Sequence, residues 1–127
     1  MDQLPESERS DTWLTYGEQK HHVHLSHAYT TLGDTRRAHE SQQRALELSA
    51  PTSTMTRTLL HIDGAACAHH DGDSEEACRR TVAALTGLPG NYRTGLVLRR
   101  TLDLYEAIPA QHHHERAVRE LRNVLAA

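Results

Sequence analysis

Histidine is the residue type with the most obvious chemical potential here, with eleven copies in 127 residues. Four of them, His21, His22, His24 and His27, lie within one predicted helix. Pairs three residues apart are neighbours on a helix and can share a metal ion. Each three-residue step rotates the side chain by about 60°, however, so three ligands do not readily converge on one ion. The sequence therefore predicts polar surface histidines, with no metal site and no cofactor.

An acid–base site is the second chemistry that the residue types allow. Glu18, His24, His27 and Asp63, together with Tyr16, would supply imidazoles and carboxylates at the mouth of a groove. No spacing requires such a grouping, and the chain has no GxSxG, P-loop or GxGxxG motif. A non-enzymatic function is therefore favoured. The alternative is a small biosynthetic-pathway enzyme or ligand-binding protein that uses histidines and acids in a groove.

A sequence pattern that occurs twice indicates which structural elements position these groups. Gly33 and Gly72 are 39 residues apart, and so are Ala38 and Ala77. A fixed period with glycine at a turn and alanine at helix crossings is typical of stacked helical hairpins. The sequence predicts an all-α domain of about three antiparallel helical hairpins over residues 11–127. A disordered N-terminal lead is expected at residues 1–10.

The expected helices follow from apolar periodicity and from the glycines and prolines that end them. Their spans are 12–31, 35–49, 52–70, 74–86, 92–108 and 112–125. Ser74 is the expected N-cap of the fourth helix. Cys67 and Cys78 lie on either side of the Gly72 turn, where they could face each other across the hairpin, and we expect them to be reduced core residues.

Charge and hydropathy exclude two kinds of partner. The formal net charge is -3, so no global field attracts nucleic acid. Paired arginines alternate with acidic residues at helical spacing, which is typical of a solvated surface, and we expect no direct nucleic-acid binding. The sequence contains neither an apolar leader nor a run of about 18 apolar residues, so we expect a cytoplasmic protein without membrane contact.

The first copy of this sequence pattern resembles a tetratricopeptide repeat. The matching positions are Leu25, Ala28, Tyr29, Gly33, Ala38, Ala45, Leu46 and Leu48. The chain departs from the repeat at His22, Ser26 and Gln42. The resemblance implies a superhelix whose concave face is formed by the first helix of each hairpin.

A longer stretch is similar to the C-terminal repeat region of actinomycete-type helix-turn-helix transcriptional regulators. The similarity is carried by residues 13–18, 57–66, 73–78, 98–102 and 117–121. In such regulators this region receives a signal or a partner, while a separate N-terminal domain binds DNA. That domain is absent here, so we expect either a fragment of a regulator or a stand-alone relative.

The resemblance places a ligand-binding groove on the concave face. The expected groove residues are Lys20, Val23, His27, Thr30, Thr31, Leu59, Ile62, Ala66, His69, His70, Arg93, Val97 and Arg100. An apolar floor with a cationic rim fits a peptide or an anionic ligand. The favoured function is a binding or adaptor module for a peptide, protein segment or small signal molecule, linked to transcriptional regulation. A homodimer through the exposed end of the stack, around Trp13 and Tyr16, is a further hypothesis.

Overall fold

The structure is a computed structural model that describes residues 6–49, 54–89 and 95–126, with side-chain surroundings from residue 17 onward. All regular elements in these ranges are helical. They are α1 (Glu6–Leu32), α2 (Thr35–Leu48), α3 (Thr54–His70), α4 (Ser74–Thr86), α5 (Gly95–Ala107), a short 3-10 helix (Ala110–His112) and α6 (Arg116–Ala126). The described residues contain no strand, which confirms the predicted all-α class.

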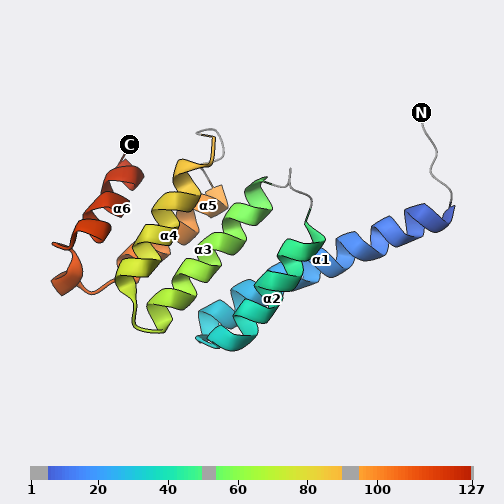
Figure 1. Cartoon of the computed structure of the whole chain (residues 1–127), viewed down its shortest axis with the longest axis horizontal. Coiled ribbons are helices and arrows are strands. Elements are labelled where there is room, and N and C mark those ends of the chain that lie inside the picture. Colours follow the sequence, from blue (N-terminus) through green and yellow to red (C-terminus); the bar gives the residue numbers. More distant parts are fainter. Residues whose placement is uncertain (1–5, 50–53, 90–94, 127) are drawn as a thin grey trace.

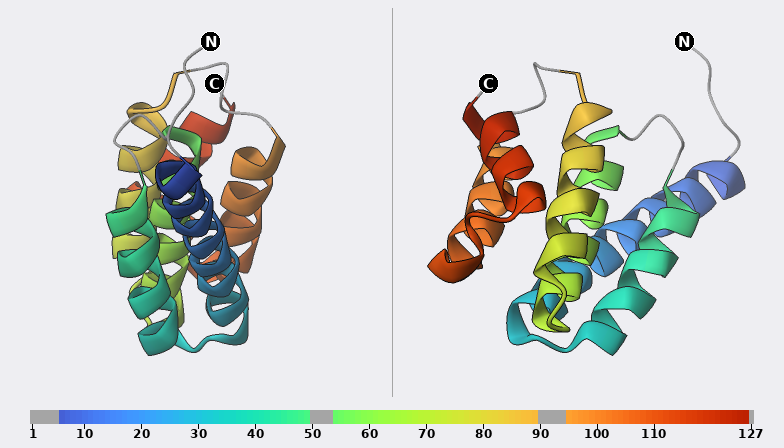
Figure 2. Two further views of the ribbon diagram at one scale, coloured as in Figure 1. Left: turned by 90° about the vertical axis from the view of Figure 1, so that its right-hand side faces the viewer. Right: turned by 60° about the vertical axis from the view of Figure 1, so that its left-hand side comes forward.

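The helices form two layers. Consecutive helices run antiparallel, and α1 projects well beyond the end of α2 (Figure 1). Helix α3 contacts both α1 and α5, whereas α4 contacts α6. Helices α2 and α4 lie on one side of the molecule and α1 and α5 on the other (Figure 2). The first helices of the successive pairs therefore share one layer, which is the layer that carries the candidate site.

The sequence repeat is also a repeat of backbone geometry. Gly33 and Gly72 end α1 and α3 with φ of 77° and 91°, values that glycine adopts without steric cost. Each glycine N–H donates to the carbonyl three residues earlier, and the following Asp34 or Asp73 N–H donates to the carbonyl five residues earlier. Asp34 and Asp73 then cap α2 and α4 by accepting a backbone N–H. Asp73 is thus the cap, and the predicted cap Ser74 is the first residue of α4.

The two halves of the molecule are packed with different kinds of side chain. The larger apolar cluster joins α3 to α6 and comprises Leu59, Ile62, Cys78, Leu85, Leu88, Val97, Ile108, Val118 and Leu121. The α1–α2 hairpin instead buries small or polar residues, namely Ser26, Thr30, Ala38, Ser41, Gln42, Ala45 and Ser49. Burial of apolar area is the main stabilising term in folding. The α1–α2 hairpin therefore depends more on hydrogen bonds for its attachment to α3.

Replacing either repeat alanine with leucine should destabilise the fold. Ala38 and Ala77 are both 0% exposed, so the three additional carbons of each leucine must displace a neighbouring helix. We expect Ala38→Leu and Ala77→Leu each to lower the free energy of unfolding by about 1–3 kcal/mol. Urea denaturation followed by circular dichroism measures this. The exposed Ala28→Leu is the control and should stay within about 0.5 kcal/mol of the parent; equal effects at all three positions would contradict the assigned register.

Helix α1 begins earlier than the sequence predicted. It starts at Glu6, whereas the expected helix began at residue 12. Residues 1–5 lie outside the described part of the chain, and the side chains of Trp13 and Tyr16 do so too.

Helix α6 begins later than predicted, because the three histidines before it form an ordered connection. His112 Nδ1 lies 2.5 Å from a carboxylate oxygen of Glu115. His113 Nε2 lies 2.9 Å from the carbonyl oxygen of Ile108, and its ring packs on Tyr105 with centroids 4.9 Å apart. These contacts hold the chain in a 3-10 turn, so the α-helix starts only at Arg116.

The two cysteines are buried free thiols with different surroundings. Cys67 Sγ lies 3.6 Å from the hydroxyl of Thr30 and 3.7 Å from Nε2 of Gln42, between α3 and the first hairpin. Cys78 belongs to the apolar cluster, where burial raises the pKa of its thiol to about 11, with a further contribution from Glu115. The raised pKa disfavours a reactive thiolate at Cys78.

Candidate functional site

A hollow of about 280 Å³ lies on the α1–α3–α5 layer. We call it the groove pocket. It is lined by His27 and Thr31 from α1, by Ile62, Asp63, Ala66, His69 and His70 from α3, and by Arg100, Asp103, Leu104 and Ala107 from α5. The lining therefore combines apolar side chains with a few polar and charged groups, as is usual in ligand pockets.

Asp63 is the centre of a polar network at the wall of this pocket. Its carboxylate is 3% exposed, and its Oδ2 accepts a hydrogen bond of 3.0 Å from the hydroxyl of Ser26. Arg100 Nη1 lies 3.4 Å from Oδ1 and 3.5 Å from Oδ2. His27 Nδ1 lies 3.5 Å from Oδ1. One carboxylate thus connects three helices that are distant in sequence.

Burial dominates the electrostatics of this network. It raises the pKa of Asp63, while Arg100, Ser26 and His27 act in the opposite direction. The Arg100 side chain is 12% exposed, and its Nε is buried without a hydrogen-bond partner. The pair therefore carries a large desolvation cost, and removing either partner would leave the other buried and unpaired.

The rim of the groove pocket is built mainly from imidazoles. His27 is 48% exposed. His69 Nδ1 lies 3.1 Å from the hydroxyl of Ser74, and the pKa of His69 is lowered by burial and by the neighbouring His70. Asp103 pairs with Arg99 at 3.5 Å, as Asp63 pairs with Arg100. The acidic groups are therefore balanced, and protonation of any rim histidine makes the pocket cationic.

The structure brings together about half of the predicted groove residues. His27, Thr31, Ile62, Ala66, His69, His70 and Arg100 all line the pocket. Thr30, Leu59 and Val97 are buried instead, because they lie on the helix faces that pack against neighbouring helices. Lys20 and Val23 lie one to two turns before His27, away from the pocket. Arg93 lies outside the described residues.

Sequence reasoning missed Ser26 and Asp103 as parts of the site. Ser26, Asp63 and Arg100 are spaced by 37 residues in each step, close to the repeat period. That regular spacing is a signal that these polar residues occupy equivalent places on successive first helices. Asp103 lies three residues after Arg100, which puts the two on one face of α5.

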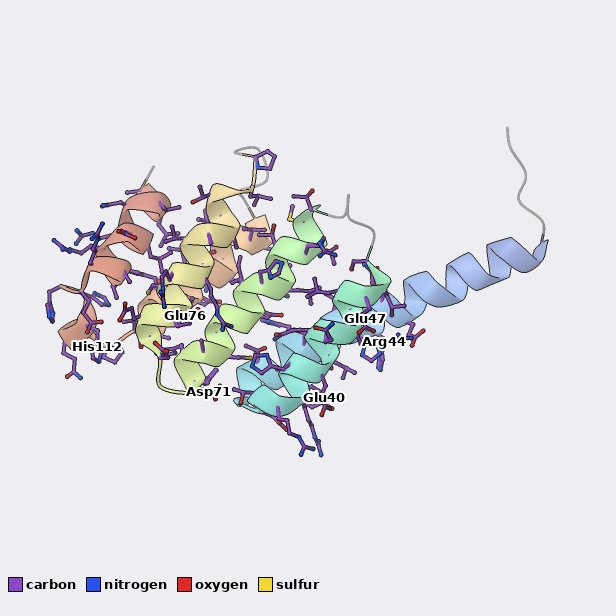
Figure 3. All side chains as sticks on the ribbon, in the orientation of Figure 1. Glu40, Arg44, Glu47, Asp71, Glu76 and His112 are labelled. Carbon is purple, nitrogen blue, oxygen red and sulfur yellow. The ribbon has the colours of Figure 1, made fainter. Side chains whose placement is uncertain are left out.

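The predicted acid–base group does not assemble as a whole. Glu18 pairs with Arg44 of α2 at 3.0 Å, and His24 is exposed and does not line the pocket. Arg44 also lies beside Glu47 on α2 (Figure 3). Among the members whose side chains the structure describes, which leaves out Tyr16, only His27 and Asp63 meet. Within the described ranges, no three His, Cys, Asp or Glu side chains are grouped so that they could hold a metal ion.

The fold and the site define an all-α helical protein with a repeated hairpin geometry and a polar pocket on its first-helix layer. No family model, curated protein or solved structure matches this chain. Among the described helices, none combines the length and the apolar character needed to cross a membrane.

Proposed function

We propose that this chain is a non-enzymatic binding module of tetratricopeptide type, and that its groove pocket receives a peptide segment or small signal molecule with an anionic group. The observation that carries the proposal is the convergence of polar groups from α1, α3 and α5 on one open hollow, around buried Asp63 and Arg100. A cytoplasmic role linked to transcriptional regulation, and a homodimer through the α1 end, belong to the same proposal through the sequence resemblance.

The choice of an anionic ligand follows from the groups on the rim. Asp63 and Asp103 are each paired with an arginine, so neither leaves an unbalanced negative charge. The imidazoles of His27 and His70 offer N–H donors to a carboxylate, and a protonated imidazole strengthens such a bond. Ile62, Ala66 and Leu104 provide an apolar wall for the rest of the ligand.

Selection of peptides from a random heptapeptide display library on the full-length protein tests this proposal. We expect the selected sequences to be enriched in Asp and Glu. Thr31→Trp should then weaken binding by at least about tenfold, because the indole would fill the mouth of the groove pocket. Thr86→Trp is a matched control, since Thr31 and Thr86 are both exposed and both donate to the carbonyl four residues earlier.

Two outcomes would contradict the proposal. Equal loss of binding in the Thr31→Trp and Thr86→Trp variants would show that the ligand does not occupy the groove pocket. Selection of neutral or basic peptides would show that its rim does not recognise anions. Circular dichroism of both variants separates a binding defect from unfolding.

The contact between His27 and Asp63 supports a second candidate function, acid–base catalysis. An enzyme would lose turnover completely on His27→Gln, whereas a binding module would lose affinity in a graded manner. Incubation of a cell extract with wild-type protein and with His27→Gln, followed by mass spectrometry, distinguishes the two. A metabolite consumed by the wild type alone would favour the enzyme.

A further inference from the structure

A second hollow, of about 500 Å³, lies on the other side of α3, between α2 and α4. We call it the α2–α4 cavity. Its floor is formed by Leu46 and Leu60 and by the small residues Gly64 and Ala84, which leave the space unfilled. Its volume is within the range of about 300–1,000 Å³ that is typical of small-molecule sites.

The α2–α4 cavity is separate from the groove pocket. Leu60, His61 and Gly64 face the cavity, whereas Ile62, Asp63 and Ala66 face the groove pocket. A helix turns by about 100° per residue, which places these two sets on opposite sides of α3. A ligand in one hollow therefore cannot contact the lining of the other, and the cavity's function is independent of the one proposed above.

The wall nearest α2 is held in place by hydrogen bonds. Gln42 Oε1 lies 3.3 Å from Nδ1 of His39, and Gln42 Nε2 donates to Cys67 Sγ at 3.7 Å. A Cβ at Gly64 would lie only 3.4 Å from Gln42 Oε1, so the backbone of α3 itself forms this part of the floor. The cavity thus presents a preformed shape to a flat or branched apolar group.

The mouth of the α2–α4 cavity carries positive charge. None of the residues that line the cavity, all of which lie in the described ranges, is acidic, and Arg80 is the one among them with a permanent charge. Glu76 pairs with both Arg79 and Arg80, so a single carboxylate is shared between two guanidinium groups. His61 adds an imidazole whose pKa is lowered by burial and by Arg57.

We infer that the α2–α4 cavity binds a small organic acid with an apolar aromatic or branched body. The body would pack on Leu46, Leu60 and the backbone of Gly64, and the carboxylate would accept hydrogen bonds from the guanidinium of Arg80. The absence of a lining carboxylate disfavours an amine in the same place. Such a site would give the protein a small-molecule input on the face opposite the groove pocket.

Titration of the full-length, ¹⁵N-labelled protein with 3-phenylpropionate tests the inference by amide chemical shifts. Its neutral amide and 3-phenylpropylamine are matched probes with the same body. We expect saturable shifts at Leu60, His61 and Gly64 with the acid, at least about fivefold weaker binding of the amide, and no binding of the amine. The same titration with 4-methylpentanoate tests an acid whose body is branched and aliphatic.

Variants of the cavity mouth provide the matched controls. Arg80→Gln should weaken binding of the acid at least about fivefold, while Arg79→Gln should leave it within about twofold. Both arginines pair with Glu76, but only Arg80 lines the cavity. Ala84→Leu should abolish binding by filling the space, and circular dichroism reports whether that variant is folded.

Three results would overturn the inference. Shifts centred on His27, Thr31 and His70 would place the acid in the groove pocket. Equal binding of acid and amide, or equal loss in both arginine variants, would show that no carboxylate is recognised by Arg80. The absence of saturable shifts with either acid up to about 10 mM would show that the cavity does not bind this class of ligand.

Discussion

Asp63→Ala is expected to lower the free energy of unfolding by about 3–5 kcal/mol, the range measured when one partner of a buried ion pair is removed. The substitution would leave the Arg100 guanidinium, in a side chain only 12% exposed, without its carboxylate. It would also remove the acceptor of the buried Ser26 hydroxyl. Urea denaturation at neutral pH, followed by circular dichroism, measures the loss.

Asp63→Asn is the control, and it should cost less than Asp63→Ala, because the amide keeps a hydrogen-bond acceptor although it removes the negative charge beside Arg100. The amide oxygen still accepts from Ser26 and lies beside Arg100, and the raised pKa of Asp63 shows that burial favours a neutral group at this position. Equal losses in the alanine and asparagine variants would contradict this account.

The raised pKa of Asp63 determines the direction in which the stability of the protein changes with pH. Folded protein holds the Asp63 proton more tightly than unfolded protein, so the contribution that the bound proton makes to stability is complete below the ordinary pKa of 3.8 for this carboxyl group. That contribution is lost as the pH rises from 3.8 through the raised pKa of the folded state. The difference in stability between wild type and Asp63→Asn should follow this trend, since asparagine does not titrate.

The buried pair also changes how the groove pocket can be tested. Reversing the charge of Arg100 is expected from the sequence to weaken ligand binding without unfolding the chain. In the structure, Arg100→Glu would place a second carboxylate next to Asp63 in a buried site. We expect this variant to destabilise the fold, so a loss of binding could not be assigned to the groove pocket. The exposed Thr31 is therefore the better position for a substitution that tests binding.

Amide hydrogens of the α1–α2 hairpin should exchange with solvent about 100-fold faster than those of α3 to α6. The hairpin buries Ser26, Gln42 and other small or polar side chains, whereas the helices after it share the large apolar cluster. Opening the hairpin therefore exposes less apolar area than opening the rest. Hydrogen exchange under native conditions, read by mass spectrometry of peptides from residues 17–48 and 97–121, tests this.

Two variants make the exchange experiment specific. Asp63→Ala should accelerate exchange in the α1–α2 hairpin and around Arg100 of α5, because the hydrogen bond from Ser26 of α1 and the ion pair with Arg100 are both lost. Val118→Ala, in the apolar cluster, should accelerate exchange in α4 to α6 as well. Uniform protection along the chain, in the wild type and in both variants, would show that the hairpin is not a separately opening unit.

Local chemistry explains which features could be predicted from the sequence. The turns at Gly33 and Gly72 require a positive φ that glycine adopts readily, and each is followed by an aspartate able to cap the next helix. These choices depend on residues within one turn of helix. The helix order, the two glycine turns and the all-α class could therefore be predicted without the tertiary structure.

The rotation of each helix about its axis determines which of its side chains face the groove pocket. Two residues of one first helix, Thr30 and His27, were equally plausible groove residues in the sequence, yet packing turns Thr30 toward Cys67 and His27 toward Asp63. Contacts across 37 residues, such as Ser26 with Asp63, depend on how far each helix turns against its neighbour. A rotation of one helix by a few tens of degrees changes which side chains meet, and no local pattern specifies it. The sequence by itself therefore determined the helical hairpins and their turns, whereas the tertiary structure alone decided the polar network, the groove pocket and the α2–α4 cavity.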